Sequence, residues 1–306
     1  MGTDSKDLVT TLDKLFSVLD AIEYGSGMIF SNESEKERYE SLLMFAFRKS
    51  QAAQYHLRNV HRLMTEASVE SEASERLLRA EFANQSESGR KSMTAKFTTR
   101  IGGREYAFEL SACLQAIKSG LDFIAAASVR HLRGVRADSI RTLMGLVSKG
   151  VRGPILNEVA QSYEWLSAVR DYRHHLIHRL VIAPARGWQT SVTEAGLVKA
   201  SYPVVVPVRP PSHVSDTRRA RMMDEAVPEG LSIREMKGRV THSDGRQHLI
   251  REEISVDPAP GFTRIEDFMK EHIHAFEGFF VGIVQSLTDL RGMTATMVRE
   301  IPHTRD

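Results

Sequence analysis

The segment from Arg170 to Arg179 concentrates ionisable side chains at an unusual density. Its charged and imidazole groups are Arg170, Asp171, Arg173, His174, His175, His178 and Arg179. A buried helix end does not tolerate so many charges, and a fully solvated one rarely carries an apolar pair such as Leu176 and Ile177. We therefore expect apolar anchors here to hold polar groups at the opening of a site.

Arginine and histidine together suit the cleavage of RNA by attack of a 2′-hydroxyl on the neighbouring phosphorus. That reaction needs one proton removed and another delivered, and histidine, with an unperturbed pKa of about 6.5, can do either near neutral pH. Negative charge gathers on the phosphoryl oxygens in the transition state. Arginine stays charged and offers two parallel donors to such oxygens. These residue types favour phosphodiester chemistry without a metal.

The run Arg173-His174-His175-Leu176-Ile177-His178 resembles the R-x4-6-H signature of the HEPN superfamily. In that family a polar residue follows the arginine, and His174 fills that place. The resemblance implies an all-helical bundle, often a homodimer in which the two motifs meet at a shared cleft. Many members are ribonucleases of toxin–antitoxin, phage-defence and CRISPR systems. Lys118–Ala125 is also similar to a helix that packs beside the motif, so the resemblance covers roughly residues 105 to 182 and the last helix.

The resemblance implies a metal-independent endoribonuclease without a cofactor. Arg173 would stabilise phosphate charge, His178 would act as general acid or base, and His174 would position the phosphate or its partner. Residues five apart on an ideal helix point about 140° apart. Arg173 and His178 can therefore meet one phosphate only through the reach of arginine, a distorted helix or a dimer partner.

The expected partners are RNA, a second copy of the chain, and an antitoxin or defence-system protein. The alternative is a catalytically inactive HEPN-like module that binds a nucleotide, RNA or a protein. A second frame, Arg170-Asp171-x-x-x-His175, has the same spacing without the apolar pair, so Arg170, Asp171 and His175 are secondary candidates. Cations in the last turn of a helix also complement its dipole, which requires no chemistry at all.

A metal-dependent hydrolase is a third interpretation. His174 and His178 lie four residues apart with Asp171 near the same helical face, a spacing that suits two ligands. Further ligands would come from elsewhere, and the candidates are His272, His274, His56 and His61. These four histidines sit beside good core patterns, which is more typical of packing or surface residues, so we predict no metal.

A basic stretch immediately precedes the motif helix. Its cations are Arg130, Arg133, Arg136, Arg141, Lys149 and Arg152, against the single acid Asp138. We expect them to line the approach to the cleft and bind RNA phosphates, although a plain charged loop has the same composition. Arg218, Arg219 and Arg221 form a second, weaker cluster.

Amphipathic periodicity places these residues in a mainly helical chain. A first helix is predicted around Leu8–Ile22, and a second of roughly 30 residues follows a capping box at 34–37. Residues 67–100 show only a weak apolar pattern, so we predict a mobile connection there with at most a short helix near Leu77. A third helix is predicted over about 106–132, and a basic connector follows it. The motif helix then runs from Pro154 to about Leu180.

The composition changes after the motif helix. Residues 186–258 have β-type composition, with a hairpin predicted around His242–Gly245, and a long last helix resumes near Arg264. We therefore predict one HEPN-like domain over residues 1–306. It would be a bundle of about five long helices with a β-rich insertion at 186–258.

Bulk composition is that of an ordinary globular protein. Of 306 residues, 42% are hydrophobic and 26% charged. The net charge of +2 does not mark a generic polyanion binder, so any basic surface must be local. Cys113, the only cysteine, lies in an apolar helical pattern, so a cysteine-based zinc finger and an internal disulfide are excluded. Neither a signal peptide nor a membrane span is expected, and we predict a cytoplasmic protein.

Overall fold

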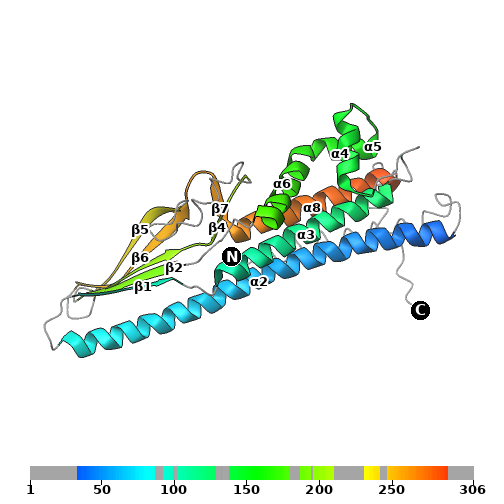
Figure 1. Cartoon of the computed structure of the whole chain (residues 1–306). Coiled ribbons are helices and arrows are strands. Elements are labelled where there is room, and N and C mark those ends of the chain that lie inside the picture. The colour runs from blue at the N-terminus through cyan, green and yellow to red at the C-terminus, as the bar shows by residue number, and fades with distance from the viewer. Residues whose placement is uncertain are drawn as a thin grey trace. The chain divides into compact units, whose positions relative to one another are not determined.

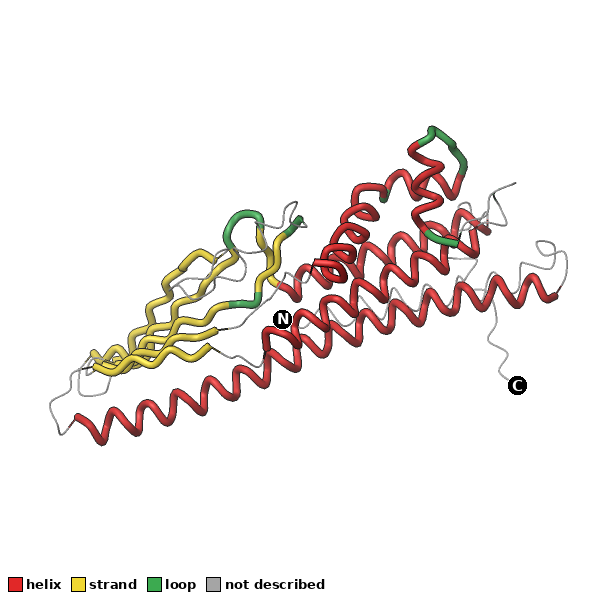
Figure 2. The backbone as a smooth tube through the Cα atoms, viewed as in Figure 1, coloured by secondary structure: helices red, strands yellow, loops and turns green. Residues whose placement is uncertain are grey.

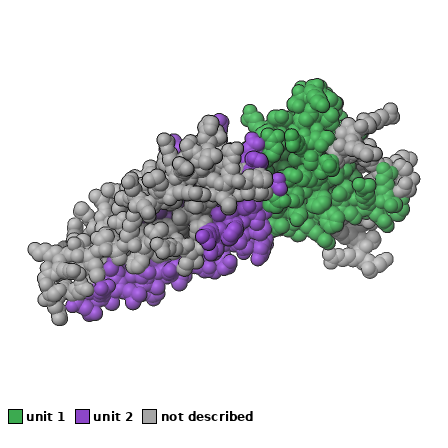
Figure 3. All heavy atoms as spheres, in the orientation of Figure 1, with its two compact units in different colours: residues 1–53, 115–170, 272–306 green, residues 54–114, 171–271 purple. Residues whose placement is uncertain are grey.

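The computed structural model describes residues 33–86, 92–98, 102–128, 132, 138–179, 187–193, 196–209, 231–241 and 247–288. By its contacts the chain divides into two compact units (Figure 3). Unit 1 comprises Met1–Ala53, Gln115–Arg170 and His272–Asp306, and unit 2 comprises Gln54–Leu114 and Asp171–Glu271. The predicted helix at 8–22, the turn at 242–245 and the second arginine cluster lie outside the described residues.

Six helices make up most of the described part of the chain (Figures 1 and 2). They are α2 (Glu33–Ser86), α3 (Gly102–Ser128), α4 (Ile140–Ser148), α5 (Pro154–Gln161), α6 (Tyr163–Arg179) and α8 (Ile265–Thr288). The predicted mainly helical class is confirmed. The specific HEPN arrangement, and the single domain that it implies, stay predictions.

Helix α2 corrects the prediction for residues 67–100. It continues without a break for 54 residues to Ser86, and its sequence contains neither glycine nor proline. The expected stripe is buried as predicted, from Tyr39 and Leu43 to Leu57 and Val60. Beyond it Leu78 is buried too, so the segment predicted to be a mobile connection is a helix over its first 20 residues.

Helix α3 carries the core as predicted. Its buried positions include Leu110, Leu114, Ile117, Leu121, Ile124 and Ala125. Within unit 1, a Cβ atom added at Gly120 would collide with the Phe276 ring, so glycine is required for this close approach to α8. The stretch Arg104–Ser128 is long and apolar enough to cross a membrane, but more than half of it is buried inside the protein. Core helices of soluble proteins share these properties, which makes it weak evidence for a span.

Two further corrections concern the motif helix and the segment before it. The predicted basic connector contains helix α4, whose first backbone N–H, at Ile140, donates to Asp122 Oδ1 of α3 at 3.2 Å. Pro154 opens α5 as predicted, but the helix does not run on to residue 180. It breaks at Ser162, whose φ of −95° and ψ of 6° leave the helical range, and α6 begins at Tyr163.

Unit 2 contains a five-stranded sheet in the order β1-β2-β3-β6-β5. Its strands are β1 (Ser92–Thr98), β2 (Gly187–Thr193), β3 (Gly196–Tyr202), β5 (Leu231–Thr241) and β6 (Gln247–Pro258). β3 and β6 pair in parallel and the other neighbours antiparallel. The β5–β6 pairing confirms the predicted hairpin. β1 was missed, and it lies outside the predicted insertion at 186–258.

Short contacts connect the sheet region to the helices of unit 2. β4 (Val205–Pro207) pairs with β7 (Phe262–Arg264), and the backbone N–H of Ile265 donates to the Val204 carbonyl at 3.0 Å where α8 begins. The predicted start of the last helix near Arg264 is confirmed. Lys199 of β3 lies 3.5 Å from Glu75 of α2, and both side chains are only 12% exposed. Figure 1 shows the sheet alongside this part of α2.

Candidate functional site

The predicted motif lies on the C-terminal half of α6, which is helical through Arg179. Asp171 and His174 are exposed and Arg173 is half-buried, all within unit 2. Arg170, also exposed, is the last residue of unit 1. The side chains of His175 and His178 lie outside the described ones, so the structure leaves the choice between the two frames, Arg173 with His178 and Arg170 with His175, as a prediction.

Tyr172 anchors this half of α6. Its side chain is fully buried, and its ring centroid lies 4.8 Å from that of Phe268 on α8, tilted by 59°. Its neighbours Asp171 and His174 are exposed. This half of α6 therefore has one face in the core and another at the surface. The predicted anchors Leu176 and Ile177 have side chains outside the described ones, so their role stays a prediction. Tyr172 was not predicted as an anchor, although it continues the spacing of three residues through Leu166 and Val169.

The Tyr172 phenol does not supply acid–base chemistry. Burial raises its pKa well above the ordinary value of a tyrosine, so the hydroxyl stays protonated at physiological pH. Among the residues that the structure describes, this hydroxyl has no hydrogen-bond partner. Tyr172 therefore holds the helix in place.

Glu266, in the first turn of α8, is a second partly buried polar group of unit 2. Burial raises the pKa of its carboxyl, Asp267 raises it further, and its own backbone N–H, Arg264 and His61 act in the opposite direction. One carboxylate oxygen is buried without a hydrogen-bond partner among the described residues. An ionised Glu266 is therefore unfavourable in the folded chain.

Glu266→Gln is expected to raise the melting temperature at neutral pH. Because the folded pKa exceeds the unfolded one, the contribution of Glu266 to stability is fully present below its ordinary pKa of 4.5 and is lost as pH rises through the folded pKa. The gain from glutamine should therefore vanish in acid. Thermal melts between pH 4 and pH 8 measure it, with Glu271→Gln, which alters an exposed carboxylate of the same helix, as the control. If Glu266→Gln raised the melting temperature equally at pH 4 and at pH 8, the ionisation of Glu266 would not be the cause.

Of the six cations predicted to bind RNA, three can be placed. Arg141 on α4, Lys149 after it and Arg152 before α5 are all exposed in unit 1. The Arg152 guanidinium donates to the Val151 carbonyl at 3.4 Å. Arg130, Arg133 and Arg136 lie outside the described residues. The exposure of the first three is compatible with phosphate binding and does not test it.

The metal interpretation finds no support among the described side chains, where no three histidine, cysteine or carboxylate groups come close enough to hold an ion. His272 is buried and His274 exposed on α8. Cys113 is fully buried, as predicted for a small core residue, and burial and the charge of Glu109 raise the pKa of its thiol. His178, a required ligand of the predicted metal site, is not among the described side chains.

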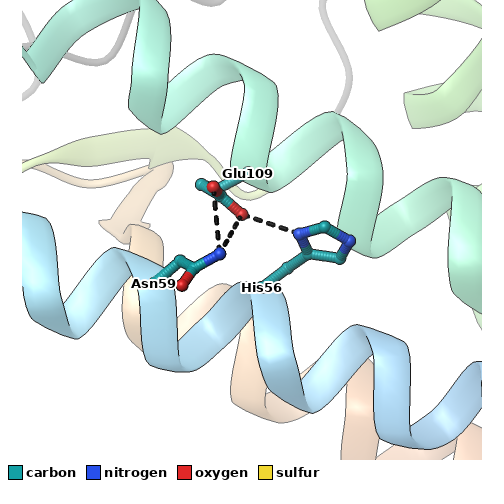
Figure 4. Close-up of polar contacts among 3 residues, drawn as sticks. All are labelled: His56, Asn59 and Glu109. Carbon is teal, nitrogen blue, oxygen red and sulfur yellow. Dashed lines mark hydrogen bonds and ion pairs between the residues drawn. The ribbon is translucent and has the colours of Figure 1, made fainter.

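His56 takes part in a polar bridge between α2 and α3 that we did not predict (Figure 4). Its Nδ1 lies 2.7 Å from Oε2 of Glu109, and the Asn59 amide donates to both Glu109 oxygens at 3.2 and 3.3 Å. The His56 and Glu109 side chains are 24% and 20% exposed. Local spacing could not have revealed the bridge, because Glu109 is 53 residues from His56 in the sequence.

Comparison with known proteins adds no relative. No family model matches the sequence, and neither a curated protein nor a solved structure matches the chain.

Proposed function

We propose that this protein is a HEPN-like endoribonuclease that cleaves RNA without a metal, with its active site on the C-terminal half of α6. The observation that carries the proposal is the two-sided environment of this helix. Tyr172 is buried, while Asp171 and His174 are exposed and Arg173 is half-buried on the same turns. A cation and an imidazole held at the surface by a core anchor suit a reaction on a large, external polyanion.

Each motif residue has a role in this proposal. The Arg173 guanidinium neutralises the phosphoryl oxygens, on which charge develops in the transition state. His178 transfers a proton to or from the reacting oxygens, and His174 positions the phosphate. Arginine is suited to this place because it stays charged and offers two parallel donors.

A second copy of the chain completes the proposed site. On a regular helix, Arg173 and His178 project about 140° apart, and α6 is helical across both positions. One subunit therefore presents the two groups toward different directions. In a symmetric dimer the arginine of one subunit can meet the histidine of the other at a shared phosphate.

The reaction can be tested with two oligonucleotides of the same sequence. The purified full chain is incubated in EDTA with single-stranded RNA and with its DNA counterpart. Because the nucleophile is the 2′-hydroxyl, we expect cleavage of the RNA alone, with an undiminished rate in EDTA. Cleavage of both strands, or activity that disappears in EDTA, would contradict the proposal, and so would intact RNA at every protein concentration.

A further inference from the structure

We infer that the outer side of the α2–α3 pair around His56 binds single-stranded RNA by stacking bases on Tyr55 and Phe108. This inference rests on the proposed function, since it supplies the contacts that hold the substrate. No stacking residues could be identified in the basic stretch at 130–152, where no aromatic residues lie between the basic ones. The structure brings two exposed aromatic residues to the same polar bridge.

The two aromatic side chains are unusually exposed for their size. Tyr55 is 54% exposed and Phe108 is 66% exposed. Tyr55 directly precedes His56 on α2. The centroids of its ring and of the imidazole are 5.5 Å apart, and the two ring planes make an angle of 74°. Phe108 directly precedes Glu109 on α3. Exposed planar rings cost solvation energy unless a ligand covers them, and every nucleobase offers a flat apolar face to do so.

The bridge between these rings presents a fixed hydrogen-bonding atom. A carboxylate only accepts hydrogen bonds, so His56 donates to Glu109 through the N–H at Nδ1. Figure 4 shows the other ring nitrogen, Nε2, on the side away from Glu109. Asn59 fixes the same carboxylate through both oxygens. His56 Nε2 is thereby held in place for a hydrogen bond with the edge of a stacked base.

One arginine accompanies each ring on its own helix. Arg58 lies one turn after Tyr55, Arg104 lies one turn before Phe108, and both are exposed. Two guanidinium groups beside two rings match the combination of cation and aromatic that binds single strands. Exposed Glu105 and partly exposed Glu109 oppose them. Stacking should therefore dominate the affinity. The salt dependence should be shallow: a plot of the logarithm of the binding constant against that of the salt concentration should have a slope of about −0.7 to −1.4 for one or two neutralised phosphates.

The test uses a single-stranded 2′-O-methyl oligonucleotide, which binds but cannot be cleaved by attack of the 2′-oxygen. Fluorescence anisotropy of the full chain gives Kd for each variant. Tyr55→Ala and Phe108→Ala are each expected to raise Kd by roughly 5- to 150-fold, the effect of losing one stacked base. His56→Gln should raise Kd by about 2- to 12-fold, the effect of one hydrogen bond. Tyr55→Phe, which keeps the ring, should bind nearly as the parent does.

Leu77→Ala is the matched control, because Leu77 is an apolar α2 residue that is 73% exposed, and its Kd should equal that of the parent. An unchanged Kd in both aromatic variants would overturn the inference, as would failure of the parent chain to bind. If Tyr55→Ala instead dissociates a dimer in sedimentation and leaves Kd unchanged, the surface contacts a second copy and the inference is wrong.

The outcomes also separate this inference from the proposed function. Binding that depends on the rings, without cleavage of ordinary RNA, supports the inference and contradicts the nuclease. If the chain cleaves RNA and its Kd is unchanged in both Tyr55→Ala and Phe108→Ala, the result supports the nuclease and overturns the inference.

Discussion

Arg173→Ala is expected to lower the rate of RNA cleavage by about 10²- to 10³-fold, the effect of removing one preorganised donor from a developing oxyanion. His178→Ala should lower it by about 10²- to 10⁴-fold, because proton transfer loses its carrier. Both substitutions lie on a regular helix, so neither should unfold the chain. The measurement is the single-turnover rate in EDTA, together with a thermal melt of each variant.

Two exposed residues provide matched controls for these substitutions. Arg38 on α2 and His274 on α8 are exposed residues of the same types, remote from the motif in the sequence. Arg38→Ala and His274→Ala should each leave both the rate and the binding of RNA unchanged. A loss of rate in His274→Ala equal to that in His178→Ala would mean that the motif has no special role.

The two frames of the motif make opposite predictions for the neighbouring pair. If Arg173 and His178 act together, Arg170→Ala and His175→Ala should retain most of the activity. If the larger losses follow Arg170 and His175, the reaction belongs to the other frame and our assignment of roles is wrong.

Tyr172→Ala is expected to lower the free energy of unfolding by about 3 to 5 kcal/mol, the usual effect of truncating a fully buried aromatic residue. The ring lies against Phe268, so the substitution leaves a cavity between the motif-bearing half of α6 and the start of α8. Equilibrium denaturation in urea measures this loss. Activity should fall with it, because the motif residues lose the packing that positions them.

Tyr172→Phe separates packing from polarity at the same position. The phenylalanine keeps the ring and removes a buried hydroxyl that has no hydrogen-bond partner among the described residues. We expect stability to be unchanged or higher by about 1 kcal/mol, with cleavage retained. A loss of cleavage in a stable Tyr172→Phe chain would show that the hydroxyl takes part in the reaction.

The helices could be predicted from the sequence where an apolar stripe repeats along one face. That signal correctly located α3, α8 and the first half of α2. It failed after residue 66, because apolar side chains become sparse there. Beyond this residue α2 has ion pairs within the helix, such as Arg79 with Glu75 at 3.1 Å. Glu75 also pairs with Lys199 of the sheet. Because the sheet that contacts this part of α2 comes much later in the sequence, the helix shows little apolar periodicity of its own.

Pairing between distant segments also explains what was missed elsewhere. Strand β1 pairs with β2, with Ser92 opposite Thr193. The two strands are far apart in the sequence, so the residues around Ser92 do not indicate this pairing. The break at Ser162 has no glycine or proline to mark it. For the site, the residue types and the helix could be predicted, whereas the anchor Tyr172 and the bridge from His56 to Glu109 depend on contacts made by the folded chain.

The chemical form of the cleaved ends tests the central claim most directly. Single-stranded RNA is cleaved by the purified chain in EDTA, and the products are analysed by mass spectrometry. Attack by the 2′-hydroxyl predicts a 2′,3′-cyclic phosphate on one fragment and a 5′-hydroxyl on the other, absent with Arg173→Ala and His178→Ala. Ends carrying a 5′-phosphate, or the same cyclic ends at undiminished yield from both variants, would contradict an RNA-cleaving site on α6.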